Sequence, residues 1–373
     1  MNDAVPRALI ADDQSDVLVA LQLLLKSEGF KIEAATSPAA VLEKVAANKY
    51  DVLLMDMNYA RDTTSGREGL DLLTRVKALD QALPVIAMTA WGSIELAVEA
   101  MQRGLSDFIQ KPWNNARLLQ VLREQLAAGR RKRAARNELV EARAIQQRLI
   151  PRASLQVGHY DFACLWQPAG EVSGDYCDIA LLEHQVALCI GDVSGKGLPA
   201  ALLMANLQAA VKTNEEAKLT PSQLVKNVNR VISQNVSENK FITFFYGVVD
   251  TRTNRLTYTN AGHNAPLLVR RDGSVFCLST GGVILGILPE YPYAQGSIEL
   301  QPGDQLLLYT DGISEATNAE GEEFGEARLQ QFLRTLGSHS AFFTLQQIHQ
   351  VVSDFHQMPE RDDRTMIAMT LAC

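Results

Sequence analysis

The sequence predicts two folded domains joined by a long helix: a doubly wound α/β domain first, and an α+β domain rich in strands behind it. Short apolar runs alternate with helical periodicity over residues 1–125, a proline-free stretch covers 115–149, and grouped strands fill the remainder. At 373 residues the chain is too long for one ordinary core. We expect limits of 1–125 and 151–373 for the two domains and 115–150 for the helical linker.

Composition indicates a soluble protein. Hydrophobic residues make up 47% of the chain and charged residues 21%, the balance of a packed globular protein. The net charge of −8 argues against nucleic acid as a partner. No apolar run is long enough to span a membrane, and the 5 cysteines are scattered. We therefore expect a cytoplasmic protein with reduced thiols and no membrane partner.

The first domain carries the pattern of a five-stranded parallel sheet covered by helices on both faces. Apolar runs at 8–11, 51–56 and 84–90 predict buried strands, and DFIQ at 107–110 predicts the last strand. Apolar residues three and four apart predict helices at 16–28, 38–48 and 68–79. In such a fold the ligand site lies at the carboxyl ends of the strands.

Acidic side chains stand where these strands end. Asp12 and Asp13 follow the first strand and Asp56 ends the third, while Thr89 and Lys111 follow the fourth and fifth. Three carboxylates at one sheet edge repel one another unless a cation neutralises them, and oxygen ligands suit Mg²⁺. A lysine and a hydroxyl beside them complete a site for phosphoryl transfer to a carboxylate.

Residues 5–125 thereby resemble the response-regulator receiver family. The resemblance implies that Asp56 is the phosphoacceptor and that Asp12, Asp13, Asp56 and the carbonyl of Asn58 bind Mg²⁺. It further implies that Thr89, Phe108 and Lys111 form the switch, and that a histidine kinase or phosphotransfer protein is the phosphodonor. The loop after Asp56 is longer than in the family, and we expect a surface loop there.

The stretch 115–149 has high helix propensity and only Gly129 as a breaker. One heptad frame has positions a and d at Leu118, Val121, Gln125, Ala128, Lys132, Ala135, Leu139, Ala142, Gln146 and Leu149. This frame predicts a switchable coiled coil and a homodimer through the linker. The basic run at 130–136 is interpreted as a solvated helix face.

The last 220 residues or so have the pattern of α+β layers. Strands are expected at 160–168, 175–182, 185–193, 243–250, 255–262, 266–270, 297–301, 305–312 and 364–372, with helices at 198–212 and 221–237. Aspartates again occur at strand ends, namely Asp175, Asp192, Asp311, Asp362 and Asp363. Such carboxylates suit a pair of hard divalent cations, which activate water for attack on phosphorus.

This second set resembles the PPM (PP2C-like) phosphatases, in the bacterial branch of sporulation and stress regulators. The resemblance implies a layered β-sandwich flanked by helices and two Mn²⁺ or Mg²⁺ ions. Asp192 is then expected to bridge the ions and the Val193 carbonyl to add a ligand, with Asp175 on one ion and Asp311 and Asp362 on the other. Asp363 is expected either to contact an ion or to support the ligands.

Two further residues stand close to these motifs. His263 is either a general acid that meets the substrate or a histidine that holds a turn through hydrogen bonds, and the second alternative is favoured. Lys196 is either a phosphate-orienting cation or a solvated side chain.

Together the motifs predict a metal-dependent protein serine/threonine phosphatase controlled by receiver phosphorylation. Family resemblance adds an expected substrate, a phosphorylated anti-sigma-factor antagonist of the STAS type. The main alternative is a receiver-controlled adaptor that uses the phosphatase fold to bind proteins without catalysis. A phosphatase for small molecules is a further alternative, and a DNA-binding regulator would need a helix-turn-helix in place of the strands.

Overall fold

A computed structural model describes residues 5–59, 66–89, 94–151, 153–215, 217–237, 239–356 and 362–372. The chain divides into two compact units, an N-terminal unit, Met1–Glu138, and a C-terminal unit, Leu139–Cys373. Each unit has its own hydrophobic core and is described by itself.

The N-terminal unit is built on a five-stranded parallel sheet with the strand order β2-β1-β3-β4-β5. Its strands are β1 (Arg7–Ala11), β2 (Lys31–Ala35), β3 (Val52–Asp56), β4 (Val85–Thr89) and β5 (Asp107–Gln110). Its helices are α1 (Ser15–Ser27), α2 (Pro38–Ala47), α3 (Arg67–Leu79), α4 (Ile94–Gln102) and the first part of α5 (Asn115–Leu149). The predicted doubly wound, five-stranded sheet is confirmed. The place of β2 was not predicted, and α4 is a helix beyond those expected.

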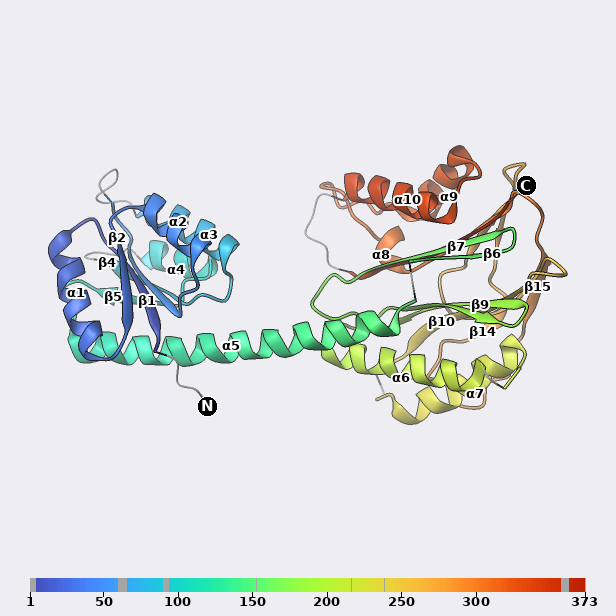
Figure 1. The fold of residues 1–373 in the computed structure, drawn as a ribbon, viewed down its shortest axis with the longest axis horizontal. Helices are drawn as coiled ribbons and strands as arrows, with labels where there is room; N and C mark the ends of the chain where they lie inside the picture. Colours follow the sequence, from blue (N-terminus) through green and yellow to red (C-terminus); the bar gives the residue numbers. More distant parts are fainter. Residues whose placement is uncertain are drawn as a thin grey trace. The chain divides into compact units, whose positions relative to one another are not determined.

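Helices cover both faces of this sheet (Figure 1). Leucines of α1 and α5, such as Leu21 and Leu118, are fully buried against one face. The helices α2, α3 and α4 cover the other face with side chains such as Val41 and Leu73. Because the strands are parallel and wound on both faces, their carboxyl ends are left open along one edge.

The helix α5 is part of the N-terminal core over its first three turns. Leu118, Val121 and Leu122 are fully buried there. Gly129 does not break the helix, because α5 continues through it to Leu149. A Cβ at Gly129 would lie 2.5 Å from the ring of Pro84, so the glycine allows the helix to approach the turn before β4. The heptad frame is therefore wrong at Leu118 and Val121, which face the core of their own unit, and at Gln146, which is 4% exposed within the C-terminal unit.

The basic run 130–136 is also partly engaged within its own unit. Arg133 donates to the carbonyl of Tyr50 at 2.6 Å and to the carboxylate of Asp80 at 3.1 Å. Only 28% of its side chain is exposed. This arginine is thus not part of a solvated helix face, because its guanidinium is used to fix α5 on the sheet.

The C-terminal unit contains two six-stranded sheets. The first has the order β14-β11-β10-β9-β8, with β15 beside β11, and consists of β8 (Tyr176–Leu182), β9 (Gln185–Val193), β10 (Ile242–Asp250), β11 (Arg255–Ala261), β14 (Gly281–Gly282) and β15 (Gly296–Glu299). The second has the order β13-β12-β16-β17-β7-β6 and consists of β6 (Ser154–Val157), β7 (Tyr160–Gln167), β12 (Leu267–Val269), β13 (Val275–Cys277), β16 (Gln305–Tyr309) and β17 (Arg364–Leu371). The helices are α6 (Leu198–Glu215), α7 (Pro221–Asn235), α8 (Asp311–Ser314), α9 (Gly325–Leu336) and α10 (Ala341–Phe355).

These elements form four layers (Figure 1). Apolar side chains from both sheets, among them Phe162 and Ile190, fill the space between the sheets. The helices α6 and α7 cover the outer face of the first sheet, and α9 and α10 cover that of the second. The layered sandwich flanked by helices is confirmed. The strand-rich pattern predicts only α6 and α7, and α9 and α10 are an addition that closes the second outer face.

Two observations concern the environment of the chain. None of the helices in the described ranges combines the length and the apolar character that crossing a membrane requires. Among the described residues, Cys164, Cys177, Cys189 and Cys277 carry free thiols.

Substitution of Gly129 by alanine tests the packing of α5. Helix propensity alone predicts that the alanine stabilises the helix by about 1 kcal/mol. The contact with Pro84 predicts the opposite, because overpacking typically costs about 1–3 kcal/mol. We expect scanning calorimetry of the full chain to show a lower melting temperature for the N-terminal unit in Gly129→Ala. A higher melting temperature would contradict the close packing of α5 against the turn.

Candidate functional site

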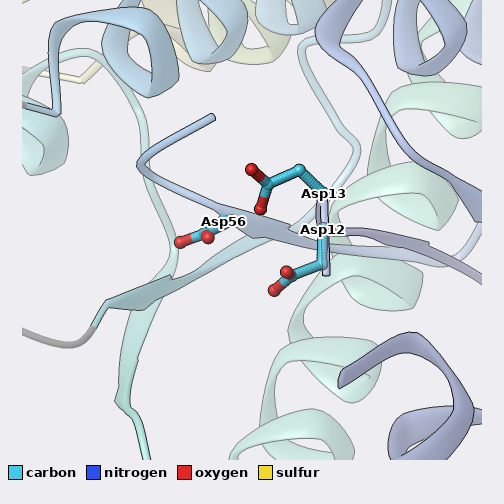
Figure 2. Close-up of side chains that lie close together, drawn as sticks. All are labelled: Asp12, Asp13 and Asp56. Atoms are coloured by element: carbon cyan, nitrogen blue, oxygen red, sulfur yellow. The ribbon is translucent and has the colours of Figure 1, made fainter. Parts of the chain in front are cut away.

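Three carboxylates meet at the open edge of the N-terminal sheet. Asp12 and Asp13 follow β1, and Asp56 is the last residue of the neighbouring parallel strand β3. One oxygen from each of the three lies within 4.8 Å of the others, and Figure 2 shows the side chains grouped at this edge. Asp12 is fully buried and Asp56 is 6% exposed. Asp13 is exposed. Two buried carboxylates beside a third repel one another, which favours a bound cation, and their oxygens are the ligands that Mg²⁺ prefers.

Lys111 reaches into this group from the residue after β5. Its Nζ donates to Asp12 Oδ2 at 2.6 Å and to Asp56 Oδ2 at 2.9 Å. Burial disfavours the charged lysine, but the hydrogen bonds to the two carboxylates outweigh it and raise the pKa of Lys111. Burial likewise raises the pKa of Asp56, although Lys111 opposes that shift. The single ammonium of Lys111 offsets only part of the negative charge at this edge, because three carboxylates, those of Asp12, Asp13 and Asp56, carry it.

The remaining receiver residues surround this edge. Thr89 ends β4 and is 9% exposed, and its carbonyl accepts the backbone N–H of Lys111 at 2.8 Å. The Oδ1 of Asn58 accepts the N–H of Gly66 at 3.0 Å. Phe108, on β5, is partly buried against the core. Residues 60–65 of the enlarged loop lie outside the described residues, so the expected surface loop is not described there.

The acids of the C-terminal unit come from both of its sheets. Asp175 precedes β8, and Asp192 lies in the neighbouring strand β9. Asp311 begins α8 directly after β16, and Asp362 and Asp363 precede β17, the strand that pairs with β16. The acids therefore converge where the ends of the two sheets meet.

The pKa values of Asp175, Asp192 and Asp311 are raised, first by burial and then by neighbouring carboxylates. Asp175 is 2% exposed, and burial, followed by the charges of Asp192 and Asp363, raises its pKa well above the ordinary range. Burial and then Asp311 raise the pKa of Asp192 to about 7. Burial and the charge of Asp362 raise the pKa of Asp311. An all-carboxylate donor set whose members repel one another fits divalent cations bound by oxygen.

The two acidic sites differ in spacing. In the described part of the chain, only the N-terminal triad brings three carboxylate oxygens within 4.8 Å of one another.

Asp363 holds the loop that leads to Asp175. Its Oδ1 accepts the N–H of Ala169 at 2.8 Å, and its Oδ2 accepts from Ser173 Oγ at 2.7 Å and from the N–H of Gly174 at 2.9 Å. Both carboxylate oxygens are thus engaged by the protein. Of the two roles expected from the sequence, this geometry favours the support of neighbouring ligands.

Close backbone approach shapes the same space. A Cβ at Gly174 would lie 3.2 Å from the carbonyl oxygen of Val193, the residue after Asp192. A Cβ at Gly312, the residue after Asp311, would lie 2.0 Å from the carbonyl oxygen of Asp363. Glycine at these two positions therefore lets the strand ends come together.

The two residues that the sequence left between alternatives take different places. Lys196 is 58% exposed at its side chain and forms an ion pair with Asp362 Oδ2 at 3.0 Å. His263 is 6% exposed, and its Nε2 lies 3.1 Å from the carbonyl of Tyr309, which can only accept. Nδ1 therefore accepts from Thr243 Oγ1 at 2.8 Å. Both ring nitrogens of His263 have protein partners, which favours the alternative in which the histidine holds a turn.

Sequence reasoning missed several polar residues of this site. Thr310 is fully buried and donates to Asp175 Oδ2 at 2.9 Å. Ser173 is fully buried and bonds Asp363. Thr310 directly precedes Asp311 in the motif YTDG, and Ser173 lies two residues before Asp175 in the motif VSGD. A hydroxyl residue this close to an expected acid could have indicated both. Gln146 contacts the same loop from α5, and nothing local in the sequence indicates that.

Family models match both units. Residues 8–123 match the model described as "Response regulator receiver domain", and residues 183–372 match the model "Stage II sporulation protein E (SpoIIE)". "Phosphoserine phosphatase RsbU" of Bacillus subtilis is 31% identical over 235 residues, which are 63% of this chain and 70% of that relative.

Solved structures resemble the C-terminal part. The RsbU and RsbW domains of a Mycobacterium tuberculosis protein match with a TM-score of 0.52 and 26% identity, over 57% of this chain and 62% of that one. The SiaA-PP2C domain of Pseudomonas aeruginosa matches with a TM-score of 0.57 and 23% identity, over 64% of this chain and 98% of that one. At 23% identity the second likeness shows the fold alone.

The burial of His263 gives a pH-dependent prediction. Burial lowers its pKa to about 4, well below the ordinary 6.5. The folded chain thus favours the neutral ring, and this contribution to stability is complete above about pH 6.5 and lost as the pH falls towards 4. We expect the ring NMR signals of His263, assigned by their absence in His263→Gln, to titrate below pH 5. Titration near pH 6.5 would show that the ring meets solvent.

Proposed function

The chain belongs to the SpoIIE family and carries a receiver domain in front, and on that premise we propose that it is a receiver-controlled, metal-dependent protein serine/threonine phosphatase. The observation that carries the proposal is the convergence of Asp175, Asp192, Asp311 and Asp362 at the meeting ends of two sheets. Burial first, and neighbouring carboxylates after it, raise the pKa values of Asp175, Asp192 and Asp311, and bound cations would offset both effects.

The N-terminal unit supports phosphorylation at Asp56. Asp12, Asp13 and Asp56, with the carbonyl of Asn58, would hold Mg²⁺, and Lys111 Nζ, 2.9 Å from Asp56 Oδ2, would hold a phosphoryl oxygen. In this proposal the phosphoryl group comes from a histidine kinase or a phosphotransfer protein, and Thr89 and Phe108 respond to it.

In the C-terminal unit the protein's part is to place ligands and exclude water. Asp192 would contact both ions, Asp175 and the Val193 carbonyl one of them, and Asp311 and Asp362 the other. When bound, Mn²⁺ or Mg²⁺ would supply Lewis acidity to the phosphate and to the attacking water. Lys196 already pairs with Asp362, so its ammonium lies where it would orient an anionic substrate.

The names of the relatives support a substrate class. A relative named phosphoserine phosphatase supports hydrolysis of phosphoserine or phosphothreonine on a protein. We propose a phosphorylated STAS-type anti-sigma-factor antagonist as that protein. A homodimer through α5 completes the proposal. The exposed apolar side chains of Val140 (47%) and Ile145 (62%) support it, and both lie outside the a and d positions of the predicted heptad frame. No observation favours a purely non-catalytic adaptor, because every acid that was expected to bind metal is present in the sequence.

The test is hydrolysis of a phosphorylated STAS-domain protein by the full chain in Mn²⁺. Asp192→Asn removes the charge expected between the ions, so we expect kcat to fall about 10²–10³-fold or more. Asp272→Asn, at an exposed turn away from the site, is the matched control and should leave kcat unchanged. Binding of the phosphoprotein without hydrolysis by the wild-type chain would support the adaptor instead.

A further inference from the structure

The loop 169–174 lies between the end of α5 and the acids of the C-terminal site. On one side its backbone and Ser173 bond Asp363, and it leads directly into Asp175. On the other side it meets residues of α5, the helix whose first turns belong to the receiver core. The loop therefore contacts both that helix and the acids of the C-terminal site.

Gln146 makes the principal contact from α5. Its amide Nε2 donates to the carbonyl of Ser173 at 2.9 Å, and its Oε1 accepts the N–H of the same residue at 3.0 Å. A backbone carbonyl can only accept and an N–H can only donate, so these partners fix the orientation of the amide. Gln146 is 4% exposed. A buried amide with both ends satisfied is costly to displace, since each group would be left without a partner.

From Ser173 the hydrogen bonds continue to the acids. The Ser173 hydroxyl donates to Asp363 Oδ2 at 2.7 Å and accepts the backbone N–H of Asp175 at 3.0 Å. Gly174 donates to the same oxygen of Asp363 at 2.9 Å. An unbroken series of hydrogen bonds thus leads from Gln146 to two residues of the metal site.

A second contact lies one turn earlier on the same face of α5. Arg143 Nη1 donates to the carbonyl of Gly170 at 3.4 Å. Positions 143 and 146 are three apart, so both side chains project from one side of the helix. Ile150, four residues beyond Gln146, packs against the cores on both sides of the first sheet. The contact between helix and loop therefore requires one register of α5 relative to the loop.

We propose that Gln146 is a positioning residue that clamps the 169–174 loop and thereby sets the affinity of the C-terminal site for its divalent cations. A shift of α5 by one residue turns the helix by about 100° and carries the amide away from Ser173. Asp175 and Asp363 then lose the support of the loop. This inference rests on the proposed function and names the contact through which the helix regulates that same site.

The test compares Gln146→Leu with Gln147→Leu. Gln147 is the exposed neighbour on α5, so its substitution has the same chemistry without the clamp. All chains carry Asp13→Asn, which disables the N-terminal triad and leaves the C-terminal site as the one titrated. Isothermal titration with Mn²⁺ should give an affinity about 10- to 100-fold weaker for Gln146→Leu, as for other residues that support metal ligands. Hydrolysis of p-nitrophenyl phosphate should recover its kcat at saturating Mn²⁺.

Equal Mn²⁺ affinities for the two variants would overturn the clamp. If circular dichroism shows that Gln146→Leu does not fold, the Mn²⁺ affinity of Gln146→Glu is compared with that of Gln147→Glu. The glutamate keeps the acceptor for the Ser173 N–H and loses the donor to its carbonyl, so weaker Mn²⁺ binding than in the Gln147→Glu chain supports the clamp, and equal binding contradicts it. Absence of Mn²⁺ binding in the chain with Gln146 intact would instead contradict the proposed function itself, and the clamp with it.

Discussion

Repulsion between carboxylates held away from water is the constraint on which both sites of this protein depend. Two like charges a few Å apart cost several kcal/mol at the low effective dielectric of a partly buried site, about 4 kcal/mol at 4 Å for a dielectric of 20. The fold nevertheless brings such groups together, because the ends of neighbouring strands share an edge. Asp56 beside Asp12, and Asp192 beside Asp175, are tolerated only through proton uptake, hydrogen bonds or cations.

The repulsion between carboxylates is offset differently in the two units. In the N-terminal unit Lys111 lies between Asp12 and Asp56 and supplies a resident positive charge, which a transferred phosphoryl group can also use. In the C-terminal unit the ion pair described for these acids joins Lys196 to Asp362 at the exposed side. The buried Asp175 accepts instead a hydrogen bond from the hydroxyl of Thr310.

Features that depend on hydrophobic periodicity or on the residues at strand ends could be predicted from the sequence. The central strand β3 is a continuous apolar run, and the aspartate at its end is conspicuous because aspartate is depleted in strand interiors. Periodicity does not show which surface an apolar stripe faces. The positions of Leu118 and Val121 are therefore compatible both with a coiled coil and with the core of their own unit, where they lie. The short strands β13 and β14 are below the length at which alternation is visible. The pairing of Gln146 with Ser173 depends on tertiary packing across 27 positions, which no local pattern encodes.

Control of the phosphatase by the receiver is the central claim, and beryllofluoride, which mimics the phosphoryl group on Asp56, tests it most directly. The measurement is the rate at which the full chain dephosphorylates a STAS-domain phosphoprotein, with and without beryllofluoride, for wild type and for Asp56→Asn. The account predicts that the rate of the wild type changes, with an increase expected, and that the rate of Asp56→Asn does not. Identical rates with and without beryllofluoride in the wild type would contradict receiver control.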